Sequence, residues 1–181
     1  MRRPEPSTRP AEPVTNRESS RSEGHLPASL DRMAALRRLG PDDWEDLRDI
    51  RLRSLADSPD AFASTLEREQ EFTEDDWRRR LSGPVYVVDD PHPVAVGGIF
   101  DNHGSPHVWG MWTDPDHRGR GHARRILDAL IPPGTTAQLD VNITNGGARA
   151  MYERYGFVGT GVVEPLRPGS DMQVELMTLR R

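Results

Sequence analysis

The sequence of 181 residues contains no cysteine. This absence excludes disulfide bonds, thiolate metal sites and an acyl-cysteine intermediate. Lysine is absent as well, so all 24 basic residues are arginine. A Schiff-base lysine and the phosphate-binding lysine of a Walker loop are therefore excluded too.

The sequence also lacks a long apolar run: no stretch approaches the ~20 apolar residues of a membrane-spanning helix. Residues 1–28 are rich in Pro, Ser, Arg and Glu and contain no segment that resembles a signal peptide. We interpret them as a disordered tail, with Met33 as an alternative start, and expect one domain over 29–181. The net charge of -5 gives no reason to expect nucleic acid or a membrane as partner. We expect a cytoplasmic protein.

The hydrophobic pattern predicts a mixed, mostly antiparallel sheet flanked by helices, a fold of the α/β (α+β) class. Helices are expected from about Asp42, over Thr73–Leu81 with Thr73 as N-cap, over Gly121–Leu130, and from about Ala148 to Tyr155. Strands are expected over Ala34–Leu39, Val85–Val88, Val94–Phe100, Val108–Trp112, Ala137–Val141, Phe157–Val163 and Gln173–Leu179.

Two arginines of the first predicted helix, Arg48 and Arg51, fall within its apolar face. One interpretation is that they face a binding cleft. We favour the other, in which each side chain lays its alkyl stem on the apolar surface and keeps its guanidinium group in water.

Asp114–Arg125, with the sequence DPDHRGRGHARR, connects a predicted strand to a predicted helix. The first turn of a helix has free backbone N–H groups, and its dipole favours an anion there. Gly119 and Gly121 have no side chain to block the approach of a phosphate. A Rossmann fingerprint would need glycine where Arg124 stands, and a Walker loop would need lysine. The loop is therefore interpreted as an anion site, and the alternative is a solvated, arginine-rich start of a helix.

Two motifs resemble those of the GNAT superfamily of N-acetyltransferases. The sequence RGRGHA of Arg118–Ala123 matches the pattern R/Q-x-x-G-x-G/A. The sequence NGGARAMYERYGF of Asn145–Phe157 resembles the pattern N-x-x-A-x-x-x-Y-x-x-x-G-F. Both motifs occur in order, with a predicted strand between them. The resemblance implies a GNAT-like acyl-CoA acyltransferase fold over roughly Ala34 to Leu179.

In proteins of this kind, acetyl-CoA lies between the splayed fourth and fifth strands. The resemblance implies that backbone groups near Trp112 and Thr113 pair with the pantetheine arm, and that Asn145 hydrogen-bonds the cofactor. Asn145 also suits an N-cap of the helix that follows it, and the two roles are compatible. The diphosphate would be held by the backbone N–H groups of Arg118, Gly119, Arg120, Gly121, His122 and Ala123.

Tyr152 matches the family's frequent general acid, which protonates the departing CoA thiolate. The alternative is a core aromatic residue, and we interpret Tyr155 as packing only. The general base is not identified, because the fourth strand contains no acid. Sequence proximity makes Asp101, His103, His107 and Asp140 candidates for the base. Further candidates from the first helical region, where such families diverge, are Glu67, Glu69 and Glu71. An ordered water chain is another alternative.

The sequence thus predicts an acetyl-CoA-dependent N-acetyltransferase that uses no metal. Because there is no cysteine, the amine is expected to attack acetyl-CoA directly in a ternary complex. We expect a small-molecule amine rather than a protein as acceptor, and a monomer or a homodimer. One alternative is a catalytically silent CoA-binding regulatory module of the same fold, and another is a nucleotide-binding protein.

Overall fold

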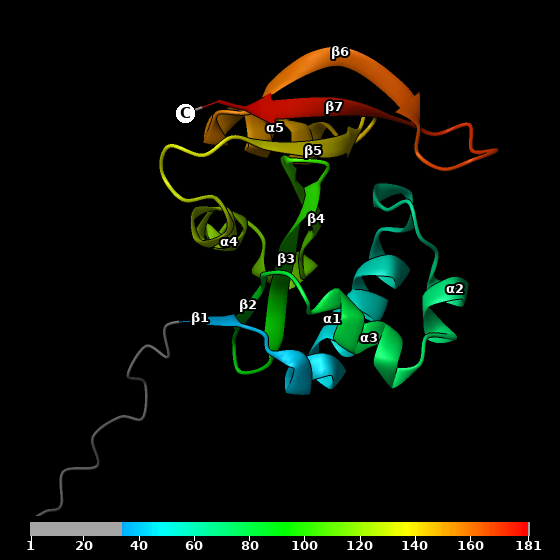
Figure 1. Cartoon of the computed structure of the whole chain (residues 1–181), viewed down its shortest axis with the longest axis vertical. Helices are drawn as coiled ribbons and strands as arrows, with labels where there is room; N and C mark the ends of the chain where they lie inside the picture. The colour runs from blue at the N-terminus through cyan, green and yellow to red at the C-terminus, as the bar shows by residue number, and fades with distance from the viewer. Residues whose placement is uncertain (1–33, 181) are drawn as a thin grey trace, which may run out of the picture. The chain divides into compact units, whose positions relative to one another are not determined.

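A seven-stranded mixed sheet organises residues 34–180, the part of the chain that the structure, a computed structural model, describes (Figure 1). The strand order is β1-β2-β3-β4-β5-β7-β6. All neighbours pair antiparallel except β4 and β5, which are parallel. The predicted fold class is therefore confirmed. The strands are β1 Ala35–Arg38, β2 Val85–Asp89, β3 Pro93–Asn102, β4 Ser105–Thr113, β5 Ala137–Asn142, β6 Val158–Pro165 and β7 Gln173–Leu179.

The four predicted helices are present, together with a short helix, α2, that was not predicted. Thr73 caps α3 as expected, because its hydroxyl oxygen accepts a hydrogen bond from the backbone N–H of Asp76 at 3.3 Å. α2 is too short to show a helical hydrophobic period. The helices are α1 Trp44–Asp57, α2 Leu66–Gln70, α3 Glu74–Arg80, α4 His122–Leu130 and α5 Gly146–Tyr155, and 3-10 turns cover Pro41–Asp43, Pro59–Ala61 and Pro115–His117.

The predicted tail 1–28, the start at Met33 and the first domain boundary lie outside the described residues, so these remain predictions.

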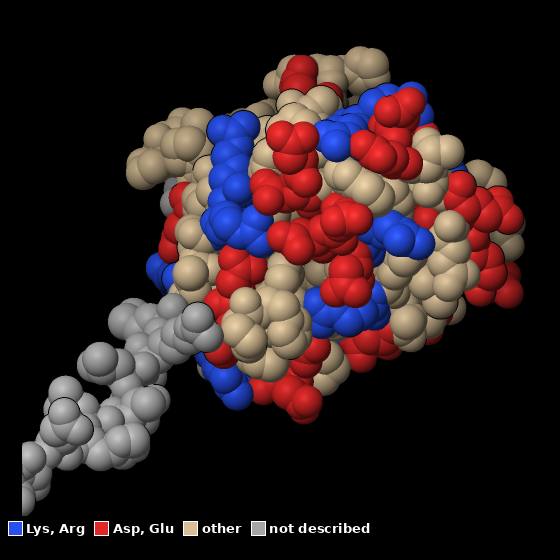
Figure 2. Space-filling view, turned by 90° about the horizontal axis from the view of Figure 1, so that it is seen from below, with Lys and Arg blue, Asp and Glu red and all other residues tan. Residues whose placement is uncertain are grey.

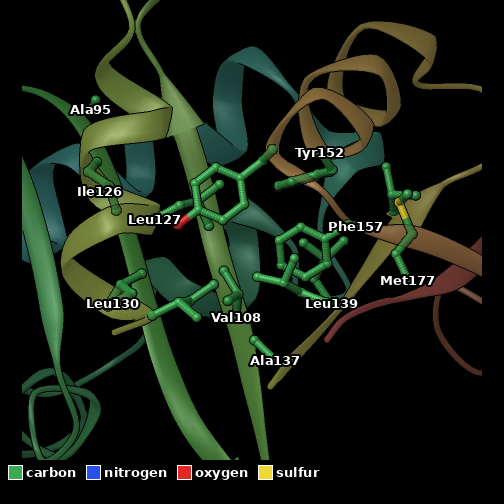
Figure 3. Close-up of a cluster of buried hydrophobic side chains, with 14 of the residues drawn as sticks. Ala95, Val108, Ile126, Leu127, Leu130, Ala137, Leu139, Tyr152, Phe157 and Met177 are labelled. Atoms are coloured by element: carbon green, nitrogen blue, oxygen red, sulfur yellow. The ribbon is translucent and has the colours of Figure 1, made fainter. Parts of the chain in front are cut away.

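Two apolar cores cover opposite faces of the sheet. In Figure 1, α4 lies on one side of β3 and β4, while α1, α2 and α3 lie on the other. The first core joins α4 and α5 to the sheet, with Ile126, Leu127 and Tyr152 among its members. Figure 3 shows these side chains beside Phe157 and Val108. The second core packs α1 and α3 on the other face. Residues on β2 thus alternate between the two cores, with Val85 and Val87 in the second and Tyr86 and Val88 at the first.

The prediction that Arg51 keeps its guanidinium group in water is wrong. Arg51 is 5% exposed, and its Nε and Nη2 atoms donate to the two carboxylate oxygens of Glu69, each at 3.0 Å. Nη2 of Arg80 donates to the same carboxylate at 3.1 Å. Glu69 belongs to α2, the helix that the sequence did not predict, so the partner was not foreseeable. Arg48, in contrast, is exposed as expected.

Charged side chains of both signs are interleaved on the face of the molecule seen in Figure 2. A part-buried example of such pairing is Arg37, which forms ion pairs with Asp43, Asp46 and Asp89. Such pairing leaves no broad field of one sign on the face shown. Among the helices of residues 34–180, none has both the length and the apolar character that a membrane crossing requires.

Candidate functional site

The only parallel neighbours in the described sheet, β4 and β5, separate soon after they meet. They pair at a single position, where His107 faces Gln138. Further along, the β3–β4 register shifts at a bulge, and Gly110 of β4 adopts a positive φ of 67°. A bulge bends a strand and increases its local twist. The edge of β4 that faces β5 is therefore left without ladder partners, and its backbone groups are available to an extended ligand.

A cavity of about 630 Å³ runs from this opening to the glycine loop. It is lined by β4, by the loop and start of α4, by α5, and by the connection between α1 and α2. It brings together nine of the ten predicted site residues, namely Trp112, Thr113, Arg118, Gly119, Gly121, His122, Ala123, Asn145 and Tyr152. Arg120, the tenth, belongs to the loop but does not line the cavity.

The glycine loop presents free backbone donors to the cavity. Among residues 34–180, no acceptor is found for the N–H groups of residues 119–124. The N–H group of Arg118, which the sequence also assigned to the diphosphate, instead donates to the backbone oxygen of Pro115 at 3.4 Å. Gly119 and Gly121 have positive φ values of 76° and 80°, and an added Cβ at either would meet nothing within 4 Å. The glycines thus permit the backbone turn and leave the space above it open. A row of free N–H groups at a helix start fits a diphosphate.

The arginine side chains of the loop are largely engaged with the protein itself. Nε of Arg118 donates to the backbone oxygen of Thr113 at 3.0 Å, and its Nη2 donates to Asp57 Oδ2 at 2.7 Å. Nη2 of Arg120 donates to the backbone oxygen of Asp116 at 3.0 Å. These contacts support an anion site built from backbone N–H groups, with Arg118 anchoring the loop.

Asp57, the last residue of α1, ties three segments together. Its Oδ2 atom accepts hydrogen bonds from Trp112 Nε1 at 2.9 Å and from Arg118. The hydrogen bond from Trp112 is the largest cause that holds the pKa of Asp57 below its ordinary value of 3.8. The ionised carboxylate therefore links the end of α1 to β4 and to the glycine loop. The sequence analysis did not single out this residue.

Asn145 caps α5 in the way that its sequence context suggested. Its Oδ1 atom accepts a hydrogen bond from the backbone N–H of Ala148 at 3.1 Å. The side chain also lines the cavity. The N-cap role is thus observed, while the contact with a cofactor remains a prediction.

Tyr152 lines the cavity and also belongs to the first core, in which Figure 3 labels it near Phe157. The residue is 7% exposed, and its ring packs edge-on against Phe157 with centroids 5.8 Å apart. Burial raises the pKa of the phenol above its ordinary value of 10.0, so the hydroxyl group stays protonated at neutral pH. That hydroxyl has no hydrogen-bond partner in the described part of the chain. Tyr155 packs in the same core, and its hydroxyl donates to Asp128 at 3.0 Å.

The candidate bases fall into three groups. Asp101 and His103 are exposed near the β3–β4 turn, and Glu67 and Glu71 are also exposed. Glu69 is fully buried between two arginines. His107 and Asp140 form a pair between β4 and β5, with Nε2 and Oδ2 3.1 Å apart. None of these seven residues lines the cavity.

The sequence analysis missed one wall of the cavity, the α1–α2 connection, which contributes Ser58, Ala61 and Phe62. Asn142 of β5 holds this segment by donating from Nδ2 to the backbone oxygen of Asp60 at 2.7 Å. The segment has no hydrophobic period and no motif, so the sequence carried no signal for its position.

The mixed sheet, the separation of β4 from β5 and the glycine loop at the start of α4 together define the class of the protein, which has an acyltransferase fold. The model of the Acetyltransferase (GNAT) family matches residues 44–157, and the chain belongs to this family. Among curated proteins, none matches the chain in sequence.

Several solved structures share this fold. A GNAT-family acetyltransferase from Streptococcus pneumoniae aligns with a TM-score of 0.67 and 15% identity, over 82% of this chain and 99% of that one. A putative acetyltransferase from Salmonella typhimurium, solved with its cofactor acetyl-CoA, gives 0.65 and 15%, over 82% and 94%. The ribosomal-protein-S18-alanine N-acetyltransferase of Escherichia coli gives 0.60 and 19%, over 82% and 94%. At these identities the likeness establishes the fold.

Proposed function

We propose that the protein is an N-acetyltransferase that transfers the acetyl group of acetyl-CoA to a primary amine. The observation that carries the proposal is a single cavity that joins the free N–H groups of the glycine loop to the buried phenol of Tyr152. The cytoplasmic location expected from the sequence is part of the same proposal, as is catalysis without a metal. No group of three or more potential metal ligands is found among the described residues.

Different residues of the cavity bind different parts of acetyl-CoA. The N–H groups of residues 119–124 bind the diphosphate, and the free edge of β4 near Trp112 and Thr113 binds the pantetheine arm. Asn145 adds a side-chain hydrogen bond beside its capping role. Acetyl-CoA itself supplies an acetyl group activated as a thioester. Fixed backbone N–H groups near the thioester oxygen stabilise the charge that develops there.

Tyr152 acts as the general acid. A phenol is protonated at neutral pH, and burial raises the pKa of Tyr152 further, so its hydroxyl group carries a proton for the departing thiolate. Without a partner among residues 34–180, this hydroxyl is also free to form a new hydrogen bond in the cavity. The amine attacks directly, since the chain has no cysteine to carry the acetyl group.

A small-molecule amine is the proposed acceptor. The α1–α2 connection covers one end of the cavity and is tied down by Asn142, an arrangement that suits a compact acceptor better than a long peptide. The fold by itself does not choose, because the E. coli neighbour is named for a ribosomal-protein acceptor. The acceptor panel must therefore include peptides.

The test is release of free thiol from acetyl-CoA across aminoglycosides, polyamines, amino acids and peptides. With an active acceptor in hand, Tyr152→Phe is expected to lower kcat by about 10²–10⁴-fold, the usual contribution of a general acid, with little change in the Kd for acetyl-CoA. Tyr155→Phe is the matched control, because it removes a neighbouring hydroxyl that already donates to Asp128.

Two results would contradict the proposal. Silence with every acceptor alongside tight CoA binding would favour the catalytically silent module. Parallel double-reciprocal lines with a trapped acetyl-enzyme would contradict direct attack in a ternary complex. An unchanged kcat in Tyr152→Phe would remove Tyr152 from the mechanism while leaving the activity intact.

A further inference from the structure

His122, the first residue of α4, is buried at the edge of the cavity and has no hydrogen-bond partner for its ring among residues 34–180. The residue is 5% exposed and lines the cavity. Its two ring nitrogens, Nδ1 and Nε2, are buried, and neither has a hydrogen-bond partner in the described part of the chain. Buried polar groups are normally hydrogen-bonded, so an imidazole with neither nitrogen paired calls for an explanation. A ligand in the cavity would supply the missing partner.

Two arginines bring positive charge near His122, Arg125 from α4 and Arg120 from the glycine loop. His117, in the 3-10 turn before the loop, is a further titratable neighbour. Asp90, in the β2–β3 turn, is the carboxylate on this side, and it also lies 3.8 Å from His117 Nε2 and 3.7 Å from Arg120 Nη1.

A second carboxylate, Asp114, is already engaged by His117 at 3.5 Å and by Arg53 at 3.3 Å. Burial first, and then these positive neighbours, lower the pKa of His122 below its ordinary value of 6.5. The imidazole is therefore neutral at pH 7 in the free protein.

We propose that the His122 side chain is a proton-linked ligand of the diphosphate: it takes up one proton from solvent when the diphosphate occupies the glycine loop, and the resulting imidazolium donates a hydrogen bond to it. This inference rests on the proposed function, because it assumes acetyl-CoA as the ligand. Neutral His122 has one N–H donor without an acceptor, and a phosphate oxygen is an acceptor that also favours the charged form. The diphosphate adds negative charge beside an imidazole whose other neighbours are mainly cations.

The sign of the pH dependence follows from linkage. If the pKa of His122 is higher in the complex than in the free protein, the complex binds more protons. The affinity for acetyl-CoA is then highest at low pH and falls as the pH rises from the free pKa to the bound pKa. With one linked proton, the Kd rises by at most about tenfold per pH unit within this window.

Isothermal titration calorimetry measures the proton uptake directly. Acetyl-CoA is titrated into the full-length protein at pH 6.5 in two buffers of different ionisation enthalpy, such as PIPES and imidazole. The difference in apparent enthalpy gives the number of protons taken up, and about half a proton or more is expected for one shifted imidazole. His122→Gln is expected to lose most of this uptake. The 3′-phosphate of acetyl-CoA also titrates, but equally in parent and variant.

His117→Gln is the matched control, since His117 also lines the cavity but is already paired with acidic side chains. It is expected to retain the uptake. Because His122→Gln replaces a buried side chain, NMR of the histidine ring nitrogens in the parent protein gives a test that needs no folded variant. One imidazole with an unusually low pKa is expected to become protonated at pH 6.5 when acetyl-CoA is added.

Equal uptake by parent and His122→Gln would overturn the inference, as would loss of uptake in His117→Gln alone. No change in any histidine signal on addition of acetyl-CoA would overturn it as well. These outcomes leave acetyl-CoA binding, and hence the proposed function, intact. A parent protein that binds no acetyl-CoA would instead refute the proposed function and this inference with it.

Discussion

Replacing Glu69 with glutamine is expected to destabilise the fold strongly although the two side chains have nearly the same shape. Glu69 is fully buried, and its carboxylate accepts two hydrogen bonds from Arg51 and one from Arg80. Arg51 is buried as well, and its guanidinium group lies 4.4 Å from the ring centre of Phe62. The neutral amide of the glutamine leaves the positive charge of Arg51 buried without a counter-ion.

The expected loss is about 3–5 kcal/mol of unfolding free energy, the range measured when one partner of a buried ion pair is removed. For a chain of this size, each kcal/mol shifts Tm by about 2–4 °C, so Tm is expected to fall by roughly 6–20 °C. Arg80 adds less to the loss because its side chain keeps 26% of its surface exposed and can turn toward water.

Equilibrium urea unfolding at pH 7 measures this loss, with Glu67→Gln as control. Glu67 is an exposed residue of the same helix, so its substitution is expected to stay within about 0.5 kcal/mol of the parent. The double variant Arg51→Met with Glu69→Leu removes the pair as a unit, and it is expected to be more stable than Glu69→Gln alone.

The pH dependence gives a second check. Burial acts to raise the pKa of Glu69, but the hydrogen bonds and charges of Arg51 and Arg80 outweigh it and lower the pKa below 4.5. The carboxylate therefore stabilises the fold fully above about pH 4.5, and this contribution is lost as the pH falls through the folded-state pKa. The difference between parent and Glu69→Gln should shrink in that range. A loss below 1 kcal/mol at pH 7, or a difference independent of pH, would refute this account of the buried pair.

Two further predictions concern the glycine loop and its anchor. Gly121→Ala and Gly134→Ala each place a side chain at a positive φ with open space around it, so each is expected to cost about 1–2 kcal/mol of stability. Only Gly121→Ala should also weaken acetyl-CoA binding in calorimetry. Equal affinities of the two variants for acetyl-CoA would contradict the role of the glycine loop. Asp57→Ala removes the acceptor shared by Trp112 and Arg118 and so releases the glycine loop from the end of α1. Fixing about one released residue again when acetyl-CoA binds costs about 1–2 kcal/mol, so the Kd is expected to rise by about 5–30-fold. Asp49→Ala, at an exposed residue of the same helix, should leave that Kd unchanged.

The sequence predicted the order of strands and helices because the signals involved are local. Short runs of β-favouring residues between turn residues mark β2, β3 and β4, and the stripe of Ile126, Leu127 and Leu130 marks α4. The glycine loop was likewise predictable, since both glycines and the helix that follows them are adjacent in sequence. α2 escaped prediction because five residues are too few to show a period.

Long-range contacts were decided only by the tertiary structure. The sequence placed Arg51 on an apolar face but could not supply Glu69 as its partner, and it gave no reason to connect Asp57 with Trp112 and Arg118. Periodicity reports which residues face the interior, whereas the partner that each meets depends on how distant segments pack.

The glycine loop, which we propose as the cofactor end of the site, could therefore be predicted from the sequence, because its free N–H groups lie in one short segment. The acceptor end could not, because its wall comes from the α1–α2 connection, which only the fold brings over β4 and β5. The burial of His122, whose ring nitrogens find no partner in the described part of the chain, is likewise a property of the fold, because no local pattern fixes what surrounds a side chain.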